Sequence, residues 1–377
     1  MELRECRTDT CPPDRVSPGW KVELLEGGRS LSRLWVVDRQ VRVGGCVLRV
    51  GGIACVGTSR AHRGKGLASR VMEAAQGLMR REGYHASILH GIPNFYHRFG
   101  YAPCMPEYAL SIPASHSRRA PGGLKLRTLR PADLPAVAEL YNRENAGRTG
   151  TAVRDPRTWK GFPRSTGYFM KPAARLAVDG EGRLRGYLVW DDDHRWCRAS
   201  EAGGSGAEVH AAFWKHLAAR AAALGKREIL LAMPPDHAFS LYLRDRGCVA
   251  RINWHRNGKF MGRIVDFPAC MGAVAAGLGR SWESRPEPGR VSLATDLGAV
   301  TLEVRAGVGN SQVTPAPGGA RGGARLGQAA LFQLLMGYRT PRDLADNGGL
   351  KAAPGQLSLL SRWFPLRMAH MWWADRF

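Results

Sequence analysis

One segment constrains the fold of this chain more than any other: residues 52–72, GIACVGTSRAHRGKGLASRVM. Its apolar and β-branched residues predict a strand that ends at Thr58, and apolar residues at helical spacing predict a helix from Leu67. A basic turn with two glycines lies between them. The first N–H groups of a helix have no intrahelical partner, and the helix dipole favours negative charge there. The segment therefore predicts a binding site for phosphate groups.

The residue order in the turn narrows the kind of phosphate site. Glycines in the turn would let the backbone approach phosphates closely, because a side chain would stand in the way. The G-K-[ST] order of a Walker loop is absent, and the dinucleotide motif G-x-G-x-x-G lies differently relative to its helix. The alternative is a plain basic turn that caps a helix. The predicted cofactor-binding residues are Cys55, Val56, Gly57, Arg63, Gly64, Lys65, Gly66, Leu67 and Ala68.

Strand-like and helix-like runs divide the 377 residues into three blocks, and their mixture predicts an α/β (α+β) fold. Residues 1–120 contain several strand-like runs around the basic turn and its helix. Residues 121–266 mix strands with helices, including a long helix at about 208–224. Residues 267–377 contain two strands, a Gly- and Pro-rich loop at 314–326, a helix and an aromatic tail.

The charge of the chain is unusual, because 55 Lys and Arg stand against 32 Asp and Glu, a net charge of +23. Such an excess favours a polyanionic partner: nucleic acid, an acidic membrane or a phosphorylated cofactor. Few of the basic residues are lysine, however, and a GC-rich coding sequence would give the same excess of Arg and Gly without any such partner. Since no nucleic-acid-binding motif is recognisable, we expect no specific nucleic-acid partner.

The cysteines and the apolar runs indicate the compartment. The eight cysteines form no C-x-x-C pair, so no metal site is predicted. The first twenty residues have no apolar run, and no stretch of about 20 apolar residues occurs in the sequence. We therefore expect a cytoplasmic protein with reduced thiols and without a membrane span.

Two motifs resemble a known family. The R-x-x-G-x-A pattern at Arg63, Gly66 and Ala68, which follows a V-G-T strand, resembles the acetyl-CoA pyrophosphate motif of the GNAT N-acetyltransferases. Downstream, the L-H pair at 89–90 and the run FYHRFGY at 95–101 resemble a segment of the Eis (enhanced intracellular survival) acetyltransferases. The resemblance implies acetyl-CoA as the acyl donor, with no metal, and an amine as the second substrate.

The plan of the Eis family follows the order of the three blocks. The resemblance implies an acetyl-CoA-binding GNAT domain at 1–120 and a second, degenerate GNAT-like domain at 121–266, which has no R-x-x-G-x-A pattern of its own. A sterol-carrier-protein-like domain is expected at 267–377, with its C-terminus returning to the active site. The resemblance also implies a homo-oligomer, often a hexamer.

The resemblance also implies roles for three residues. Tyr96 matches the family tyrosine that protonates the departing thiolate, and a phenol with a pKa of about 10 keeps its proton near neutral pH. The alternative is a tyrosine that only packs beside Phe95 and Phe99. The family's base is the C-terminal carboxylate of a final phenylalanine, here Phe377, which is ionised near neutral pH. His90 is either a proton relay or a structural histidine at a strand end.

One departure from the family concerns the acceptor side. A GNAT domain usually has two helices after its first strand, and they form one wall of the acceptor pocket. Only about 50 residues precede the strand at 52–58, and the first twenty lack helical periodicity, so we expect this helix pair to be reduced or absent.

The sequence predicts direct acetyl transfer to a primary amine of an aminoglycoside, polyamine or protein lysine. The alternative is a non-catalytic acyl-CoA- or lipid-binding protein with a relict GNAT site.

Overall fold

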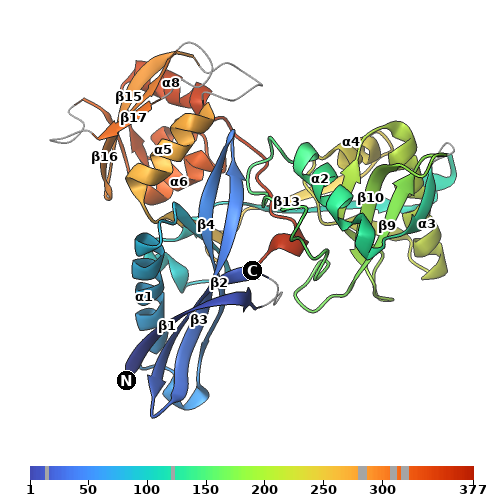
Figure 1. Cartoon of the computed structure of the whole chain (residues 1–377). Coiled ribbons are helices and arrows are strands. Elements are labelled where there is room, and N and C mark those ends of the chain that lie inside the picture. Colours follow the sequence, from blue (N-terminus) through green and yellow to red (C-terminus); the bar gives the residue numbers. More distant parts are fainter. Residues whose placement is uncertain (13–16, 120–123, 279–286, 306–311, 316–321) are drawn as a thin grey trace.

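The structure is a computed structural model, and it describes residues 1–12, 17–119, 124–278, 287–305, 312–315 and 322–377. These residues form three sheets with helices packed against them (Figure 1). The predicted α/β (α+β) class is confirmed. Within these ranges, no helix is both long and apolar enough to cross a membrane.

The first sheet has seven strands in the order β1-β2-β3-β4-β5-β14-β6. All neighbours in it are antiparallel except β4 and β5, which are parallel and are joined by α1 (Leu67–Arg81). The strands are β1 (Glu2–Cys11), β2 (Ser17–Glu26), β3 (Arg29–Val43), β4 (Cys46–Thr58), β5 (Ala86–Gly91), β14 (Lys259–Ile264) and β6 (Ala102–Pro103).

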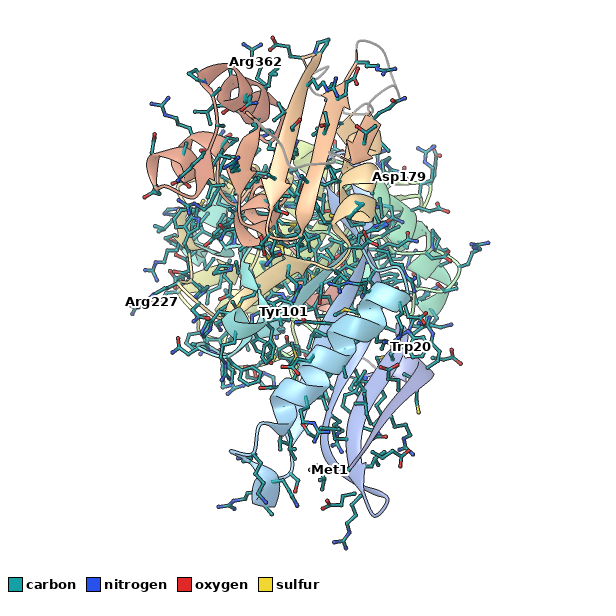
Figure 2. The ribbon with its side chains drawn as sticks, turned by 90° about the vertical axis from the view of Figure 1, so that its left-hand side faces the viewer. Met1, Trp20, Tyr101, Asp179, Arg227 and Arg362 are labelled. Carbon is teal, nitrogen blue, oxygen red and sulfur yellow. The ribbon has the colours of Figure 1, made fainter. Side chains whose placement is uncertain are left out.

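Helix α1 packs on one face of the first sheet, as the apolar spacing predicts. Its buried side consists of Leu67, Val71, Met72, Ala75, Leu78 and Met79. Figure 2 shows α1 lying in front of the strands, with Met1 and Arg362 at opposite ends of the molecule. Two short 3-10 helices belong to the same domain, η1 (Arg60–His62) and η2 (Tyr96–Phe99).

The first two strands follow one another almost directly. Strand β1 ends at Cys11 and β2 begins at Ser17, and the two pair antiparallel. Only residues 12–16 separate them, which is too short for two helices. The segment between β1 and β2 therefore leaves no room for the helix pair.

The second sheet also has seven strands, in the order β13-β7-β12-β11-β10-β9-β8. They are β13 (Val249–Asn253), β7 (Glu107–Pro113), β12 (Glu228–Leu231), β11 (Arg198–Gly204), β10 (Leu184–Asp191), β9 (Pro172–Val178) and β8 (Lys125–Thr128). The helices of this part are η3 (Ala114–Arg119), η4 (Pro131–Asp133), α2 (Leu134–Glu144), α3 (Ala207–Ala223) and α4 (Ala238–Arg244).

The first two sheets exchange strands across the predicted domain boundaries. Strand β7, from the block predicted to end at residue 120, lies in the second sheet between β13 and β12. Strand β14, from the block predicted to end at residue 266, lies in the first sheet between β5 and β6. The boundaries at 120 and 266 therefore do not separate the sheets. The physical reason is that β14 pairs with β5 along all six of its residues and buries Phe260 and Met261.

The third sheet has five strands, in the order β17-β16-β15-β18-β19. They are β17 (Gln312–Pro315), β16 (Gly298–Val304), β15 (Gly289–Thr295), β18 (Ala324–Leu326) and β19 (Leu350–Lys351). The helices are α5 (Phe267–Leu278), α6 (Gln328–Leu335), α7 (Pro341–Asp346), α8 (Pro354–Trp363) and η5 (Trp373–Asp375). Of the loop predicted at 314–326, residues 316–321 lie outside the described part of the chain.

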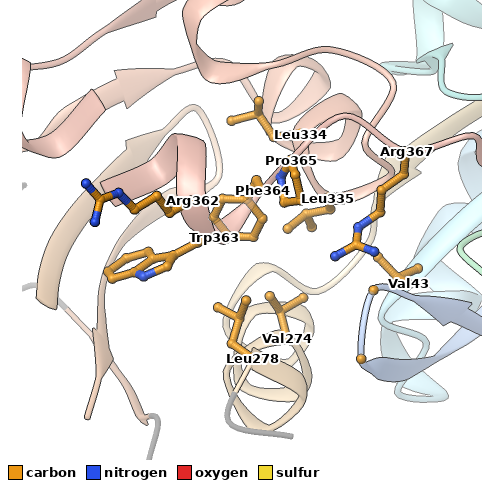
Figure 3. A pocket seen from close by; sticks show the side chains of 12 residues that line it. Val43, Val274, Leu278, Leu334, Leu335, Arg362, Trp363, Phe364, Pro365 and Arg367 are labelled. Atoms are coloured by element: carbon orange, nitrogen blue, oxygen red, sulfur yellow. The ribbon is translucent and has the colours of Figure 1, made fainter. Parts of the chain in front are cut away.

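The third domain shares one apolar core with the first sheet. Val43 and Leu48 of the β3–β4 hairpin join the same buried cluster as Val274 of α5 and Leu335 of α6. A cavity of about 40 Å³ lies at this junction, between the hairpin, α5, α6 and the end of α8 (Figure 3). The face of the first sheet opposite α1 is therefore covered in part by the third domain.

The C-terminal tail crosses from the third domain to the other two, and a buried ion cluster holds it there. Arg154 donates to Glu201 (2.6 Å) and to both carboxylate oxygens of Asp375 (3.0 and 2.9 Å). Tyr141 donates to Asp375 at 3.0 Å, and its ring lies 3.6 Å from the Arg154 guanidinium. Burial alone would lower the pKa of Arg154, but Asp375 and then Glu201 raise it well above its ordinary value.

We expect Arg154→Met to destabilise the protein by about 3–5 kcal/mol, because two buried carboxylates lose their counter-charge. Arg183, whose ion pair with Asp179 is exposed at the arginine end, offers a matched control. Arg183→Met should change the free energy of unfolding by about 0.5 kcal/mol or less. The measurement is urea unfolding followed by tryptophan fluorescence. Equal unfolding midpoints for the two variants would contradict this role of the cluster.

Candidate active site

Strands β4 and β5 stop pairing part of the way along β4. Their parallel register runs from Val50 opposite Ala86 to Ile53 opposite Leu89 and goes no further within the described residues. Just beyond, the register between β3 and β4 is irregular, and Cys55 has a positive φ of 48°. A left-handed residue is uncommon outside glycine and redirects the strand. The last residues of β4 therefore have backbone groups that β5 does not occupy.

The basic turn follows this end of β4 and has the geometry of an anion site. Gly66 is the N-cap of α1 in a left-handed conformation, and no side chain caps the helix. Gly64 is also left-handed, and a Cβ at either glycine would point into open space. No acceptor among the described residues takes the backbone N–H groups of residues 64–68. Arg63 and Lys65 are exposed on the same turn.

The structure thus brings the predicted cofactor residues to one end of the first sheet. Cys55, Val56 and Gly57 end β4, and the turn with Arg63, Gly64, Lys65 and Gly66 leads to Leu67 and Ala68 at the start of α1. The exposed N–H groups, the open glycines and the basic side chains fit a pyrophosphate. Among the described residues, no group of three or more His, Cys, Asp or Glu could hold a metal ion.

The C-terminus lies in the first domain, on the sheet face opposite α1 (Figure 1). The ring of Phe377 lies on Gly52 of β4, so closely that a Cβ at Gly52 would be 2.5 Å from its Cδ1. The Tyr168 hydroxyl, from the second domain, donates to the terminal Phe377 oxygen at 3.0 Å. Arg164 donates to the carbonyl of Arg376. Two residues before β9 of the second sheet therefore fix the terminal carboxylate beside β4.

Tyr96 lies in η2, directly after β5, and is buried. Its ring packs edge-on against Phe95 (4.9 Å between centroids) and Tyr101 (6.3 Å). Burial, and second the nearby Tyr168, raise the pKa of Tyr96 to about 12. No hydrogen bond joins its hydroxyl to another described residue, so the phenol is a protonated donor without a partner in the described part of the protein.

His90 lies on β5 next to these groups and has a carboxylate partner. Its Nε2 is 3.4 Å from Oε1 of Glu107, and His255 approaches the other oxygen at 3.0 Å. The His90 ring packs 6.1 Å from that of Tyr168. Burial lowers the pKa of His90, while the hydrogen bond with His90 and then Arg376 lower the pKa of Glu107 to about 2. His90 is therefore a neutral imidazole held beside an ionised carboxylate at neutral pH.

Cys55 is the one thiol among the predicted cofactor residues. Burial raises its pKa, although Arg164 and Arg33 oppose that rise. Its thiol therefore stays protonated at neutral pH and is a weak nucleophile. No described base accepts its proton, so the site fits direct transfer rather than a route through an acyl-cysteine.

Sequence reasoning singled out Tyr96, His90 and Phe377 but missed the residues that contact His90 and Phe377. Tyr168 and Arg164 lie between α2 and β9, in a stretch without helical or strand periodicity. Glu107 begins β7, where its contact with His90 depends on how two sheets meet. No local pattern marks any of the three.

Comparisons with known proteins agree with this architecture. Residues 12–104 match the family model of the acetyltransferase (GNAT) domain, and residues 293–372 match that of the sterol carrier protein domain. A search of curated proteins finds no significant match.

Solved structures share the fold over nearly the whole chain. A GCN5-related N-acetyltransferase from Anabaena variabilis ATCC 29413 is 21% identical with a TM-score of 0.76, covering 95% of this chain and 89% of that chain. One from Kribbella flavida is 20% identical with a TM-score of 0.72, covering 95% and 87%. Eis1 from Mycobacterium abscessus is 17% identical with a TM-score of 0.67, covering 95% and 90%.

The GNAT match contains β4, the turn and η2, and the sterol carrier protein match contains most of the tail. The chain therefore carries a GNAT acetyltransferase domain at residues 12–104 and a C-terminal sterol carrier protein domain at residues 293–372, and the GNAT domain makes it an acyltransferase.

Proposed function

We propose that this protein transfers the acetyl group of acetyl-CoA directly to a primary amine. The observation that supports the proposal is that Tyr168 contacts the Phe377 carboxylate beside β4 and also influences the pKa of Tyr96. Tyr96 comes from the GNAT domain, Tyr168 from the second domain, and the Phe377 carboxylate from the sterol carrier protein domain. In this proposal they supply a proton donor, a hydrogen bond and an anion.

Acetyl-CoA as the donor is supported by the anion site described above. The backbone N–H groups of residues 64–68 would bind its pyrophosphate, with Arg63 and Lys65 adding positive charge. The unpaired backbone of Cys55 and Val56 would bind the rest of the cofactor by strand-like hydrogen bonds. When bound, acetyl-CoA supplies a thioester, whose carbonyl carbon an amine attacks.

The residues can account for the proton movements of the reaction. The Phe377 carboxylate is ionised near neutral pH, so it can hold the incoming ammonium group and take a proton from it. The nitrogen then forms the new N–C bond as the C–S bond breaks, and the Tyr96 hydroxyl gives its proton to the departing sulfur. The second proton that the new amide nitrogen loses returns to the Tyr96 phenolate, and the proton on the Phe377 carboxyl goes to solvent. Tyr168 orients the carboxylate through its hydrogen bond.

The acceptor classes suggested by the family are aminoglycosides, polyamines and protein lysines, and the family also suggests a homo-oligomer in the cytoplasm. A thiol-release assay with acetyl-CoA and each class of amine tests the activity. Binding of acetyl-CoA without thiol release from any amine would instead favour the non-catalytic acyl-CoA-binding protein.

We expect the double variant Arg63→Gln, Lys65→Gln to bind acetyl-CoA more weakly by about tenfold, because two exposed charge contacts contribute about 0.5–1 kcal/mol each. Isothermal titration calorimetry would measure the dissociation constant. Lys351→Gln, an exposed lysine of β19, should leave it unchanged. Equal affinities for the double variant and the control would contradict the placement of the pyrophosphate.

Tyr96→Phe should lower kcat by about 10²–10⁴-fold, because it removes the general acid. One glycine appended after Phe377 should lower it as strongly, since the carboxylate would move off Tyr168. Tyr242→Phe, on α4 of the second domain, is the matched control and should retain full activity. The mechanism is wrong if neither Tyr96→Phe nor the appended glycine slows thiol release.

The raised pKa of Tyr96, about 12, also fixes a pH dependence. A phenol with this pKa keeps its proton up to about pH 10, so its acid form is not lost in the usual alkaline range. With an acceptor whose amine is uncharged throughout, kcat should stay level from about pH 8 to about pH 10. A fall with its midpoint near pH 9 would show that the acid is another group.

A further inference from the structure

The sheet face opposite α1 is uncovered next to the C-terminus, because the usual helix pair is missing between β1 and β2. Cross-strand neighbours put Arg4, Lys21, Glu23, Arg33 and Trp35 on this face: Arg4 lies opposite Glu23, Glu23 opposite Arg33, and Lys21 opposite Trp35. Arg4 and Arg33 are exposed, and Lys21 and Trp35 are half-buried. We call these five residues the open face.

The open face continues directly into the proposed active site. Trp35 lies opposite Ala54, and two residues further Val37 lies opposite Gly52, on which the Phe377 ring lies. Two residues along a strand span about 6–7 Å. Trp35 and Phe377 also pack against the same apolar cluster. An acceptor whose amine reaches the Phe377 carboxylate would therefore extend over Trp35.

The open face carries more positive than negative charge. Of these five residues only Glu23 is acidic, and it is covered by Arg4 and by Lys21, whose Nζ lies 2.6 Å away. Glu2, two residues before Arg4 on β1, is a second carboxylate that acts on Arg4. Burial raises the pKa of Glu23, but the bonds from Lys21 and Arg4 outweigh it and keep the carboxylate ionised. Arg33 has no ion pair among the described residues, and its guanidinium lies 5.6 Å from the Trp35 ring.

Glu107, an acidic side chain beside the site, also already has partners. Glu107 contacts His90 and His255, with Lys259 at 4.0 Å and Arg376 at 3.8 Å. The field of Arg33 reaches the site as well, since together with Arg164 it opposes the rise in the pKa of Cys55. Of the described carboxylates of Glu23, Glu107 and Phe377, that of Phe377 is therefore the one that has no cationic side chain paired with it, and the surroundings favour negative charge on the rest of the acceptor.

We propose that the acceptor is a primary amine carried by an acidic peptide segment, which lies on the open face with its carboxylates near Lys21 and Arg33. This inference rests on the proposed acetyl transfer and names its substrate class. The amine binds at the Phe377 carboxylate. The flanking carboxylates of the peptide lie near Lys21 and Arg33, whose positive charges attract them. A polyamine or aminoglycoside would bring a second cation against Lys21 and Arg33, which opposes its binding.

The test compares three peptides of equal length. Each has a blocked N-terminus and one lysine, flanked by Glu, Ser or Arg residues, and thiol release from acetyl-CoA gives kcat/KM for each. We expect kcat/KM for the Glu peptide to exceed that for the Arg peptide by about tenfold or more, and this preference to shrink as salt is added. An equal or higher value for the Arg peptide overturns the inference.

Reversing the charge of one residue sharpens the test. Arg33→Glu should raise KM for the Glu peptide by about tenfold and lower KM for the Arg peptide, since the attraction changes sign. Arg251→Glu, at an exposed arginine of β13 in the second sheet, should change neither value. An unchanged ratio of the two KM values in Arg33→Glu overturns the assignment of the open face.

The outcomes also separate this inference from the proposed function. Thiol release with spermidine or an aminoglycoside, but not with the Glu peptide, overturns the acidic acceptor and leaves acetyl transfer standing. Absence of thiol release with every peptide and small amine contradicts the acetyltransferase activity itself. Circular dichroism of each variant shows whether it is folded.

Discussion

The structure depends on the buried contact between Arg154 and Asp375, which fixes the last residues of the chain to the second domain. Tyr168 and Arg164, which bind the main chain of Phe377 and Arg376, add to this hold. Once Asp375 is held, Phe377 is two residues away, and its ring fills the space that Gly52 leaves on β4. The carboxylate then meets Tyr168. Three domains therefore have to fold and pack before the proposed site exists.

The same constraint explains why this chain can lack the helix pair of its family. With β1 followed directly by β2, the GNAT sheet has one face to cover without those helices. The third domain and the tail cover the inner part of that face, around Gly52 and Val37. Its outer part, at Lys21, Arg33 and Trp35, stays accessible. The missing helices thus change what an acceptor meets, while the cofactor turn on β4 and α1 is unaffected.

Sequence patterns predicted what is local in this fold. The strand, glycine turn and helix at 52–81 could be predicted because the residues that determine each of them are close together in the sequence. The resemblance to a known family pointed to Tyr96 and Phe377. The insertion of β14 beside β5 could not be predicted, because the whole second domain separates these two strands in the sequence. Tyr168 and Glu107 were missed for the same reason: both act through contacts between domains that no periodicity records.

The central claim is that the Phe377 carboxylate is a working part of the active site. The most direct measurement is kcat for thiol release by a semisynthetic protein whose C-terminus is a carboxamide. This change keeps the shape of the tail and removes the charge. The account predicts a fall of about 10²–10⁴-fold in kcat with acetyl-CoA binding unchanged. An amidated protein as fast as the free acid would contradict it.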